Sequence, residues 1–305
     1  MAPFTRLIRF ESDNGKIYFA DLGKEVLEPP AVGSKVAAFK SFEDLQSGSG
    51  SEEVTLKKLL APLPRDGLNI YCVGLNYRTH AKEASLQMSK TPPLWTKPPA
   101  TLAHPSQDIY VNDHCAKSLP DYEGELVFVT SREVKDLPES EADDAILGYT
   151  IGNDLSCRLF QAPGQGGGQF FYAKAFDNFA PMGPTLISKD VFSLKEKLTT
   201  RVNGEIRQTA DFEKDMVFTP AQVLSFMSQG TTIPAYTAVM TGTPAGVGLF
   251  MTPKSFLKDG DVVEVVLPGV GELKNKIVFQ NSLSSWAYLK VQRTVISIVT
   301  RFVKI

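Results

Sequence analysis

The chain has 305 residues, of which 43% are hydrophobic and 22% are charged, an ordinary globular composition that excludes a largely disordered chain. The formal net charge of −2 gives no electrostatic support for nucleic-acid binding, so no such partner is expected. No apolar run approaches the ~20 residues that span a membrane, and residues 1–10 lack the apolar core of a secretory signal.

Residues 1–68 are predicted to form a small N-terminal domain. Apolar and polar residues alternate over 1–40 on both sides of Asp13-Asn14-Gly15, which predicts a hairpin of short strands. The small and polar stretch 46–53 suggests a surface loop. Prolines and an Asp-Gly pair within 62–67 then mark the start of a second unit.

A strand-rich domain is expected over residues 69–280, which makes the chain an α+β protein that is mostly β. Strands are predicted at 69–75, 125–130 and 148–154, hairpins at 201–208 and 261–279, and helices at 77–88, 136–147 and 219–230. The last helix has the clearest boundaries, because Thr219 can cap it, Pro220 occupies its first position and Gly230 can end it.

The segment 281–305 is predicted to be a basic amphipathic tail. Apolar residues recur there at spacings of three and four, as on one face of a helix, and they are Tyr288, Val291, Val295, Ile298, Phe302 and Ile305. Such a helix can pack on its own core or on a partner subunit. The alternative is a helix on a membrane surface, for which the case is weak.

Three carboxylates stand at the ends of two predicted strands. Glu123 and Glu125 are two residues apart, so in a strand they point the same way, and Asp154 ends the next apolar strand. Buried carboxylates repel each other unless a cation lies between them, and oxygen ligands favour Mg²⁺, Mn²⁺ or Ca²⁺ over zinc. The alternative is a solvent-exposed strand end with surface acids.

Candidate proton-transfer and charge-pairing residues surround this motif in the sequence. His80 and Glu83 are three residues apart, so a helix puts them side by side, where they can activate a water or move a proton. A surface pair is the alternative. Lys174 lies in an apolar stretch and can neutralise a substrate carboxylate or enolate, and Arg158 can do the same with a bidentate grip.

Small residues fill the segment 241–248, which reads Thr-Gly-Thr-Pro-Ala-Gly-Val-Gly. Backbone N–H groups and hydroxyls of such a loop can bind a carboxylate or an oxyanion. The loop lacks the lysine of a phosphate-binding loop, which argues against nucleotide binding.

The order of these motifs resembles that of the fumarylacetoacetate hydrolase family. The series runs Asn-Tyr-x-x-His-x-x-Glu, Lys-Pro-Pro, Asp-Tyr-Glu-x-Glu-Leu, Gly-Tyr-Thr-x-x-Asn-Asp, Lys-x-Phe-Asp, Arg-Val-Asn-Gly-Glu and Thr-Gly-Thr-Pro-x-Gly-Val-Gly, and it covers residues ~69–279. The chain departs from many relatives at Cys157 and Leu159, at Ala235-Tyr236 and in the insert 164–169. These departures leave the three carboxylates in place and concern the identity of the substrate.

The resemblance implies a mixed β-sandwich roll preceded by a small N-terminal domain, and a homodimer. It implies that Mg²⁺ or Mn²⁺ is bound by Glu123, Glu125 and Asp154. The remaining site residues implied by the resemblance are His80 and Glu83 as a dyad on a lid helix that orders with substrate, Lys174 as a catalytic lysine, and Arg158, Gln161, Thr243 and Lys97 as substrate-binding residues.

The function expected from this resemblance is metal-dependent hydrolysis of a C–C bond in a small 2-oxo or 2,4-diketo acid of the acylpyruvate type. Oxaloacetate decarboxylation or tautomerisation passes through the same kind of enolate and is the first alternative. Isomerisation or hydration of a muconate-like acid is the second. A non-catalytic dimeric binding protein is the alternative of another class. Three cysteines without metal-type spacing favour a reducing compartment, the cytoplasm first and mitochondria second.

Overall fold

The computed structural model describes residues 3–162 and 164–280, and most of its elements are strands. The larger sheet has ten strands in the order β3 (Lys35–Ala38), β4 (Glu52–Leu60), β1 (Arg6–Ser12), β14 (Leu186–Ser188), β11 (Ile146–Asn153), β10 (Gly124–Thr130), β17 (Ala238–Met240), β5 (Ile70–Val73) and β6 (Leu94–Lys97), with β2 (Ile17–Asp21) paired to β1. A five-stranded sheet has the order β16 (Glu205–Asp211), β15 (Lys197–Val202), β18 (Val262–Leu267), β19 (Gly271–Phe279) and β8 (Ile109–Val111). The expected α+β class, mostly β, is therefore confirmed.

The remaining elements are short. Two small pairs of strands join β9 (Pro120–Asp121) to β12 (Ser156–Cys157) and β7 (Leu102–Ala103) to β13 (Ala180–Pro181). The α-helices are α1 (Phe42–Ser47), α2 (Arg78–Ala84), α3 (Asp113–Ala116), α4 (Glu139–Ala142), α5 (Phe171–Lys174), α6 (Phe212–Asp215) and α7 (Pro220–Ser228), and 3₁₀ turns occur at Pro99–Thr101, Asp143–Ala145, Arg158–Gln161 and Gly248–Phe250. No described helix is long and apolar enough to cross a membrane.

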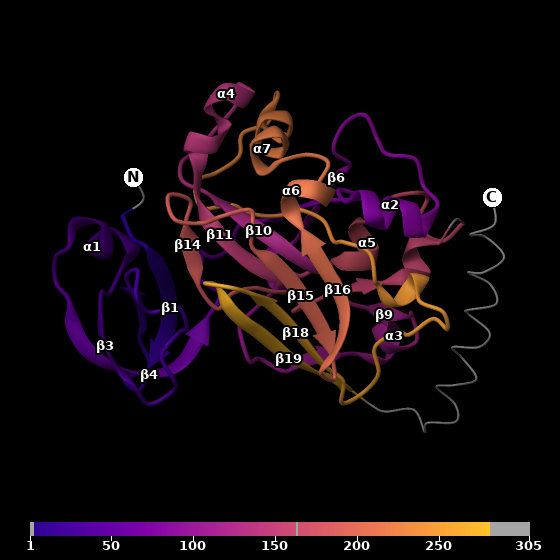
Figure 1. Ribbon diagram of the computed structural model, residues 1–305. Coiled ribbons are helices and arrows are strands. Elements are labelled where there is room, and N and C mark those ends of the chain that lie inside the picture. Colours follow the sequence, from indigo (N-terminus) through magenta and orange to yellow (C-terminus); the bar gives the residue numbers. More distant parts are fainter. Residues whose placement is uncertain (1–2, 163, 281–305) are drawn as a thin grey trace.

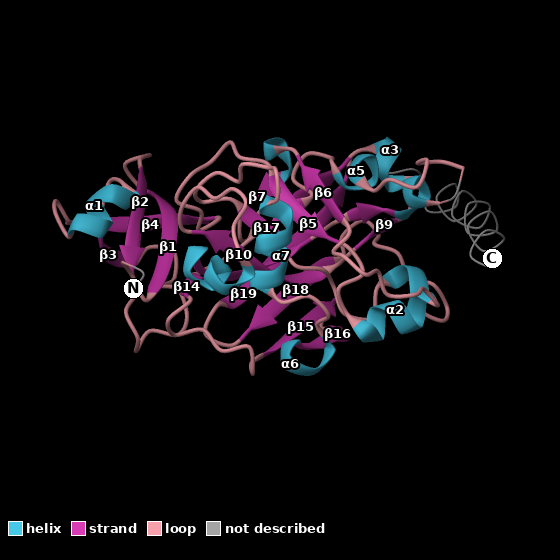
Figure 2. Ribbon diagram, turned by 90° about the horizontal axis from the view of Figure 1, so that it is seen from above, coloured by secondary structure: helices cyan, strands magenta, loops and turns pink. Residues whose placement is uncertain are grey.

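The N-terminal strands form a separate lobe that is joined to the main body by strand pairing. Strands β1 to β4 and helix α1 lie together on one side of the molecule, as Figures 1 and 2 show. β1 pairs with β14 through Arg6 and Leu7, so the sheet continues from the lobe into the body. The proposed boundary at residue 68 precedes β5, the first strand of the body.

The main hydrophobic core lies between the two large sheets. Leu126 and Phe128 of β10 belong to the same buried cluster as Leu198 of β15 and Val265 of β18. The opposite face of β10 carries Val127 and its neighbours, which belong to a second buried cluster. Because both faces of β10 and β11 are covered, these strands are buried along their whole length and are mostly apolar rather than alternating.

Local sequence signals predict several elements correctly. The Asn203-Gly204 pair has positive φ at both residues, 54° and 80°, and joins β15 to β16 in the expected hairpin. Helix α7 begins at Pro220 with a Thr219 cap, and Gln222 completes a capping box.

Three other predicted elements differ from the structure. Helix α2 ends at Ala84 instead of Met88, because Ser85 adopts a left-handed conformation with φ 54°. The helix predicted over 136–147 is two short turns, at Glu139–Ala142 and Asp143–Ala145. The loop predicted over 46–53 is partly α1 and β4. The predicted tail 281–305 lies outside the described residues.

Candidate metal centre and proton-transfer site

The pairing of β10 with β11 brings Asp154 to Glu123 and Glu125. In this antiparallel pair Gly124 lies opposite Asn153 and Glu125 lies opposite Gly152. The same register places Asp154 opposite Glu123, and the Asp154 N–H donates to the Glu123 carbonyl oxygen at 2.9 Å. Side chains that lie opposite each other or two residues apart share one face of a sheet.

Glu123, Glu125 and Asp154 are all buried, and each offers an oxygen within 4.8 Å of the others. Oxygens on opposite sides of one Mg²⁺ or Ca²⁺ are about 4–5 Å apart, so this spacing fits one hard cation. Glu125 Oε2 accepts the Gly242 N–H at 2.8 Å, whereas its Oε1 is buried with no hydrogen-bond partner among the described residues. Burial, together with Asp154 and Glu123, raises the pKa of Glu125 well above its ordinary value.

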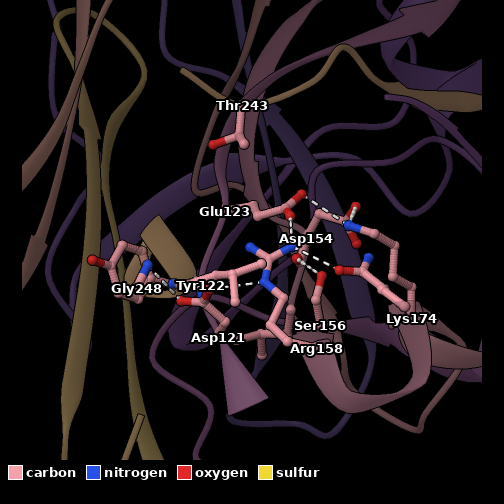
Figure 3. A network of polar contacts seen from close by, with 12 residues as sticks. Asp121, Tyr122, Glu123, Asp154, Ser156, Arg158, Lys174, Thr243 and Gly248 are labelled. Carbon is pink, nitrogen blue, oxygen red and sulfur yellow. Dashed lines mark hydrogen bonds and ion pairs between the residues drawn. The ribbon is translucent and has the colours of Figure 1, made fainter. Parts of the chain in front are cut away.

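Buried cations compensate part of this negative charge. The Lys174 ammonium donates to Glu123 at 2.8 Å and contacts Asp154, and the Lys97 ammonium contacts Asp154 (Figure 3 shows the Lys174 contacts). Burial would raise the pKa of Glu123, but Lys174 and Arg158 outweigh it and lower this pKa to about 2.

The buried charges still do not balance. The cluster holds four buried carboxylates and three buried cations, which are Asp121, Glu123, Glu125 and Asp154 with Lys97, Arg158 and Lys174. An unbalanced carboxylate charge in a buried site is costly. The spacing of the carboxylates, the unpartnered oxygen of Glu125 and this excess of negative charge all fit a divalent cation.

Asp121 is a member of this cluster that the sequence prediction missed. It is fully buried and accepts N–H bonds from Gly248 at 2.9 Å and Leu249 at 3.0 Å. It also accepts from Arg158 Nε at 2.8 Å, while Arg158 Nη1 contacts Glu123 (Figure 3). The sequence contained a signal for this residue, because Asp121, Glu123 and Glu125 occupy every second position and would share one face of a strand.

The arginine and lysine predicted to bind substrate are held by protein groups. Arg158 Nη1 donates to Gln161 Oε1 at 3.0 Å, and Arg158 Nη2 is buried without a partner among the described residues. Lys97 is fully buried and also donates to the Leu155 carbonyl oxygen at 3.2 Å. Lys97 therefore contacts a candidate metal ligand, Asp154, directly. In Arg158, the Nη2 amino group has no partner among the described residues.

Helix α2 carries the predicted dyad. His80 Nδ1 lies 2.7 Å from Glu83 Oε1, and Glu83 Oε2 accepts the Gly246 N–H at 2.9 Å. An ionised carboxylate only accepts hydrogen bonds, so this contact favours a proton on Nδ1 and a lone pair on Nε2. Glu83 and Glu125 accept N–H groups of the same loop, from Gly246 and Gly242, so the dyad and the carboxylates are attached to one segment.

The loop at residues 241–249 connects these parts. The sequence suggests that its N–H groups bind a substrate carboxylate, but those of Gly242, Gly246, Gly248 and Leu249 bind the protein's own carboxylates instead. The Thr243 hydroxyl is also occupied.

The Thr243 hydroxyl donates to the Gly124 carbonyl oxygen at 3.0 Å and accepts from Gln208 at 2.7 Å. Both contacts are with protein groups, so the hydroxyl is not free for the substrate-binding role that the resemblance implies. Gln208 also accepts the Gly124 N–H at 2.9 Å and is buried in β16. Nothing in the sequence around Gln208 distinguishes it from an exposed strand residue.

Substitution of Gly246 by alanine is expected to destabilise this loop strongly. A Cβ there would lie 1.9 Å from the Arg207 carbonyl oxygen, and the backbone φ of +108° is unfavourable for any L side chain. We expect a loss of about 3 kcal/mol or more and displacement of Glu83 from its N–H donor. Urea unfolding measures the loss. Gly230→Ala, which also has positive φ but open space around its Cβ, is the control, and an equal loss in both variants would contradict the packing argument.

Comparison with known proteins identifies the family. The model of the fumarylacetoacetate (FAA) hydrolase C-terminal region matches residues 69–278. The chain belongs to the fumarylacetoacetate hydrolase family. A relative from Bacillus subtilis named oxaloacetate tautomerase YisK is 36% identical over 234 residues, which are 75% of this chain and 76% of the relative. The human relative named oxaloacetate tautomerase FAHD2A, mitochondrial, is 33% identical over 221 residues, 72% of this chain and 69% of that protein.

Solved structures of the family share the fold. Fumarylacetoacetate hydrolase from Exiguobacterium antarcticum matches with a TM-score of 0.72 at 31% identity, covering 90% of this chain and all of that one. A 5-carboxymethyl-2-hydroxymuconate delta-isomerase from Mycobacterium smegmatis matches with a TM-score of 0.72 at 28% identity over 91% of this chain and all of that one. The chain is thus an enzyme of the fumarylacetoacetate hydrolase family with a buried acidic triad consistent with a divalent metal.

Proposed function

We propose that this enzyme catalyses the divalent-metal-dependent keto–enol tautomerisation of oxaloacetate. The observation that carries the proposal is the match over about three quarters of the chain to relatives named oxaloacetate tautomerases. The sequence alone favoured C–C bond hydrolysis, with tautomerisation as an alternative, and these relatives support the alternative better. The site is compatible, because tautomerisation needs a base, an acid and a stabilised enolate.

Glu123, Glu125 and Asp154 would hold Mg²⁺ or Mn²⁺, and Ca²⁺ is compatible with the same oxygens. The cation would act as a Lewis acid that polarises a carbonyl and so increases the acidity of the C–H bond on the neighbouring carbon. Glu125 carries the clearest support for this role, because its Oε1 is buried and unpartnered. The hydrogen bond from Gly242 fixes the orientation of its carboxylate.

His80 would move the proton. Its Nε2 removes a proton from the carbon next to the carbonyl, the electron pair becomes the enolate, and return of the proton to the carbonyl oxygen gives the enol. Glu83 holds the imidazole by Nδ1 and stabilises its charged form, and Gly246 holds Glu83. The only σ bonds that change are the C–H bond, which breaks, and the O–H bond, which forms, while the π bond moves from C=O to C=C.

Arg158 and Lys174 would neutralise the substrate carboxylate and the enolate. Arg158 Nη2 is buried without a partner among the described residues, so it is available to a carboxylate oxygen. Gln161 holds the guanidinium through Nη1. The Lys174 ammonium also lies 5.1 Å from the centre of the Trp95 ring, which places an aromatic wall beside it.

Isomerisation of a muconate-like acid is a second candidate. Two of the matched structures are named as isomerases of such compounds, and each covers 91% of this chain at 28% identity. The chemistry is again a proton transfer through an enolate, so the same residues would serve. The substrate in both cases is a small 2-oxo acid, or its enol, with at least two carboxylates. A homodimer and a cytoplasmic or mitochondrial location stay predictions.

Removal of the metal is expected to stop the reaction. The purified enzyme is given enol oxaloacetate, and loss of the enol absorbance in the ultraviolet is followed with Mg²⁺, with Mn²⁺ and with EDTA. We expect turnover with either metal, none with EDTA, and recovery when Mg²⁺ is restored. Release of pyruvate is measured in parallel, with acetylpyruvate as a second substrate.

The outcomes separate the candidate reactions. Metal-dependent enol loss without pyruvate release supports the tautomerase. Pyruvate release from acetylpyruvate would favour the C–C hydrolase, and release from oxaloacetate with CO₂ would favour the decarboxylase. Turnover in EDTA equal to that in Mg²⁺ would contradict the metal-dependent mechanism.

A further inference from the structure

The N-terminus of the helix that carries His80 and Glu83 has no side-chain cap from its own N-cap residue. Helix α2 has seven residues, and the residue at its N-cap position, Tyr77, makes no side-chain hydrogen bond to the first turn. The first N–H groups of a helix have no partner within the helix and need an acceptor from elsewhere. Only Ala81 and Ala84 of this helix are buried, so apolar packing fixes its orientation weakly.

Asp215, at the end of α6, supplies the missing acceptor. Its Oδ1 accepts the Thr79 N–H at 2.8 Å, and its Oδ2 accepts the Thr79 hydroxyl. Thr79 and Asp215 are 136 residues apart in sequence. Asp215 is 8% exposed, so water competes little for its oxygens.

The surrounding contacts hold the same two segments together. Arg78 Nη1 donates to the Met216 carbonyl oxygen at 2.7 Å, and Tyr77 forms a β-bridge with Met216. The Thr79 hydroxyl oxygen also lies 3.4 Å from the Ala245 N–H, which belongs to the loop that binds Glu83. The first turn of α2 is thus attached by polar contacts on both sides.

We propose that Asp215 is a positioning residue for the His80–Glu83 pair. Its two carboxylate oxygens accept the N–H and the hydroxyl of Thr79, the residue next to His80. Two contacts at one residue fix the position of α2 along its axis and its rotation about that axis. A rotation of this helix would displace His80 and would separate Glu83 from Gly246. The inference rests on the proposed role of His80 as the base, and Asp215 itself touches neither metal nor substrate.

The test compares Asp215→Asn with Asp211→Asn. Asp211 stands at the other end of α6 and accepts the Lys214 N–H at 3.2 Å, so it caps its own helix and is a matched control. An asparagine at 215 can still accept one N–H, but it cannot accept both Thr79 groups through carboxylate oxygens. We expect kcat to fall about 10- to 100-fold in Asp215→Asn, because small misplacements of a catalytic group have effects of that size, with KM and Mn²⁺ affinity nearly unchanged. Asp211→Asn should keep the kcat of the natural chain.

A second readout does not depend on any substrate. ¹⁵N spectra of the imidazoles report which ring nitrogen carries the proton, and the chain has three histidines to compare. We expect the His80 signal to lose its Nδ1–H character in Asp215→Asn while those of His104 and His114 stay as they are. This measurement needs no substrate, so it can test the positioning role of Asp215 even if the enzyme does not turn over oxaloacetate.

A second pair of variants covers the case in which Asp215→Asn does not fold. Thr79→Val removes the hydroxyl and keeps the shape, and Thr79→Ser keeps the hydroxyl. We expect Thr79→Val to reproduce the loss of kcat and the shift of the His80 signal, and Thr79→Ser to restore both. Natural values of kcat and an unshifted His80 signal in Asp215→Asn, or in Thr79→Val where the first does not fold, would overturn the proposal.

Discussion

Glutamine in place of Glu125 is expected to have opposite effects on metal binding and on the stability of the metal-free protein. The variant loses one anionic metal ligand, so Mg²⁺-dependent turnover should fall about 100-fold or more. It also removes a buried carboxyl group whose Oε1 has no partner among the described residues and whose pKa is raised by burial and by two neighbouring carboxylates. The metal-free fold should therefore gain about 1–3 kcal/mol.

Thermal unfolding with EDTA and with Mg²⁺ measures both effects. Mg²⁺ should raise the Tm of the natural protein and have little effect on Glu125→Gln, because ligand binding to the folded state stabilises it. Glu272→Gln is the matched control, since Glu272 is an exposed carboxylate on β19 whose side chain is 46% exposed. The prediction is contradicted if the metal-free Glu125→Gln protein is less stable than the natural chain. Protein groups, and not a metal, would then stabilise the Glu125 carboxyl group.

Alanine in place of His80 is expected to remove the chemistry and leave the metal site intact. General-base catalysis contributes about 10²–10⁴-fold, so kcat should fall by that factor while Mn²⁺ affinity stays near its natural value. Glu83→Gln should show a smaller loss, because the imidazole remains but loses the partner that fixes its Nδ1 proton. Stopped-flow assays and isothermal titration with Mn²⁺ measure the two quantities.

His114→Ala is the control for this prediction. The His114 side chain is exposed and stacks on Phe160 with ring centres 5.0 Å apart. We expect it to keep its activity. Equal losses in His80→Ala and His114→Ala, or a His80→Ala protein with natural kcat, would exclude His80 as the proton-transfer group.

The sequence by itself determined the elements whose signals are local. Asn203-Gly204 has the turn chemistry that a tight hairpin requires, and Thr219 with Pro220 marks the start of α7. The runs that form β10 and β11 are mostly apolar, and carboxylates stand at the start of β10 and directly after β11, so they indicated buried strands next to a charged site. The order of motifs was enough to indicate the family.

Only the tertiary structure decided which side chains meet. The contact of Lys97 with Asp154 and the cap that Asp215 gives to Thr79 join residues 57 and 136 positions apart. Local sequence does not specify such pairs, because they depend on strand order and on register. The same reason explains Asp121, whose spacing relative to Glu123 was visible, whereas its N–H donors come from a loop more than 120 residues away. Charges this deeply buried are stable only with partners, and the folded sheets supply those partners.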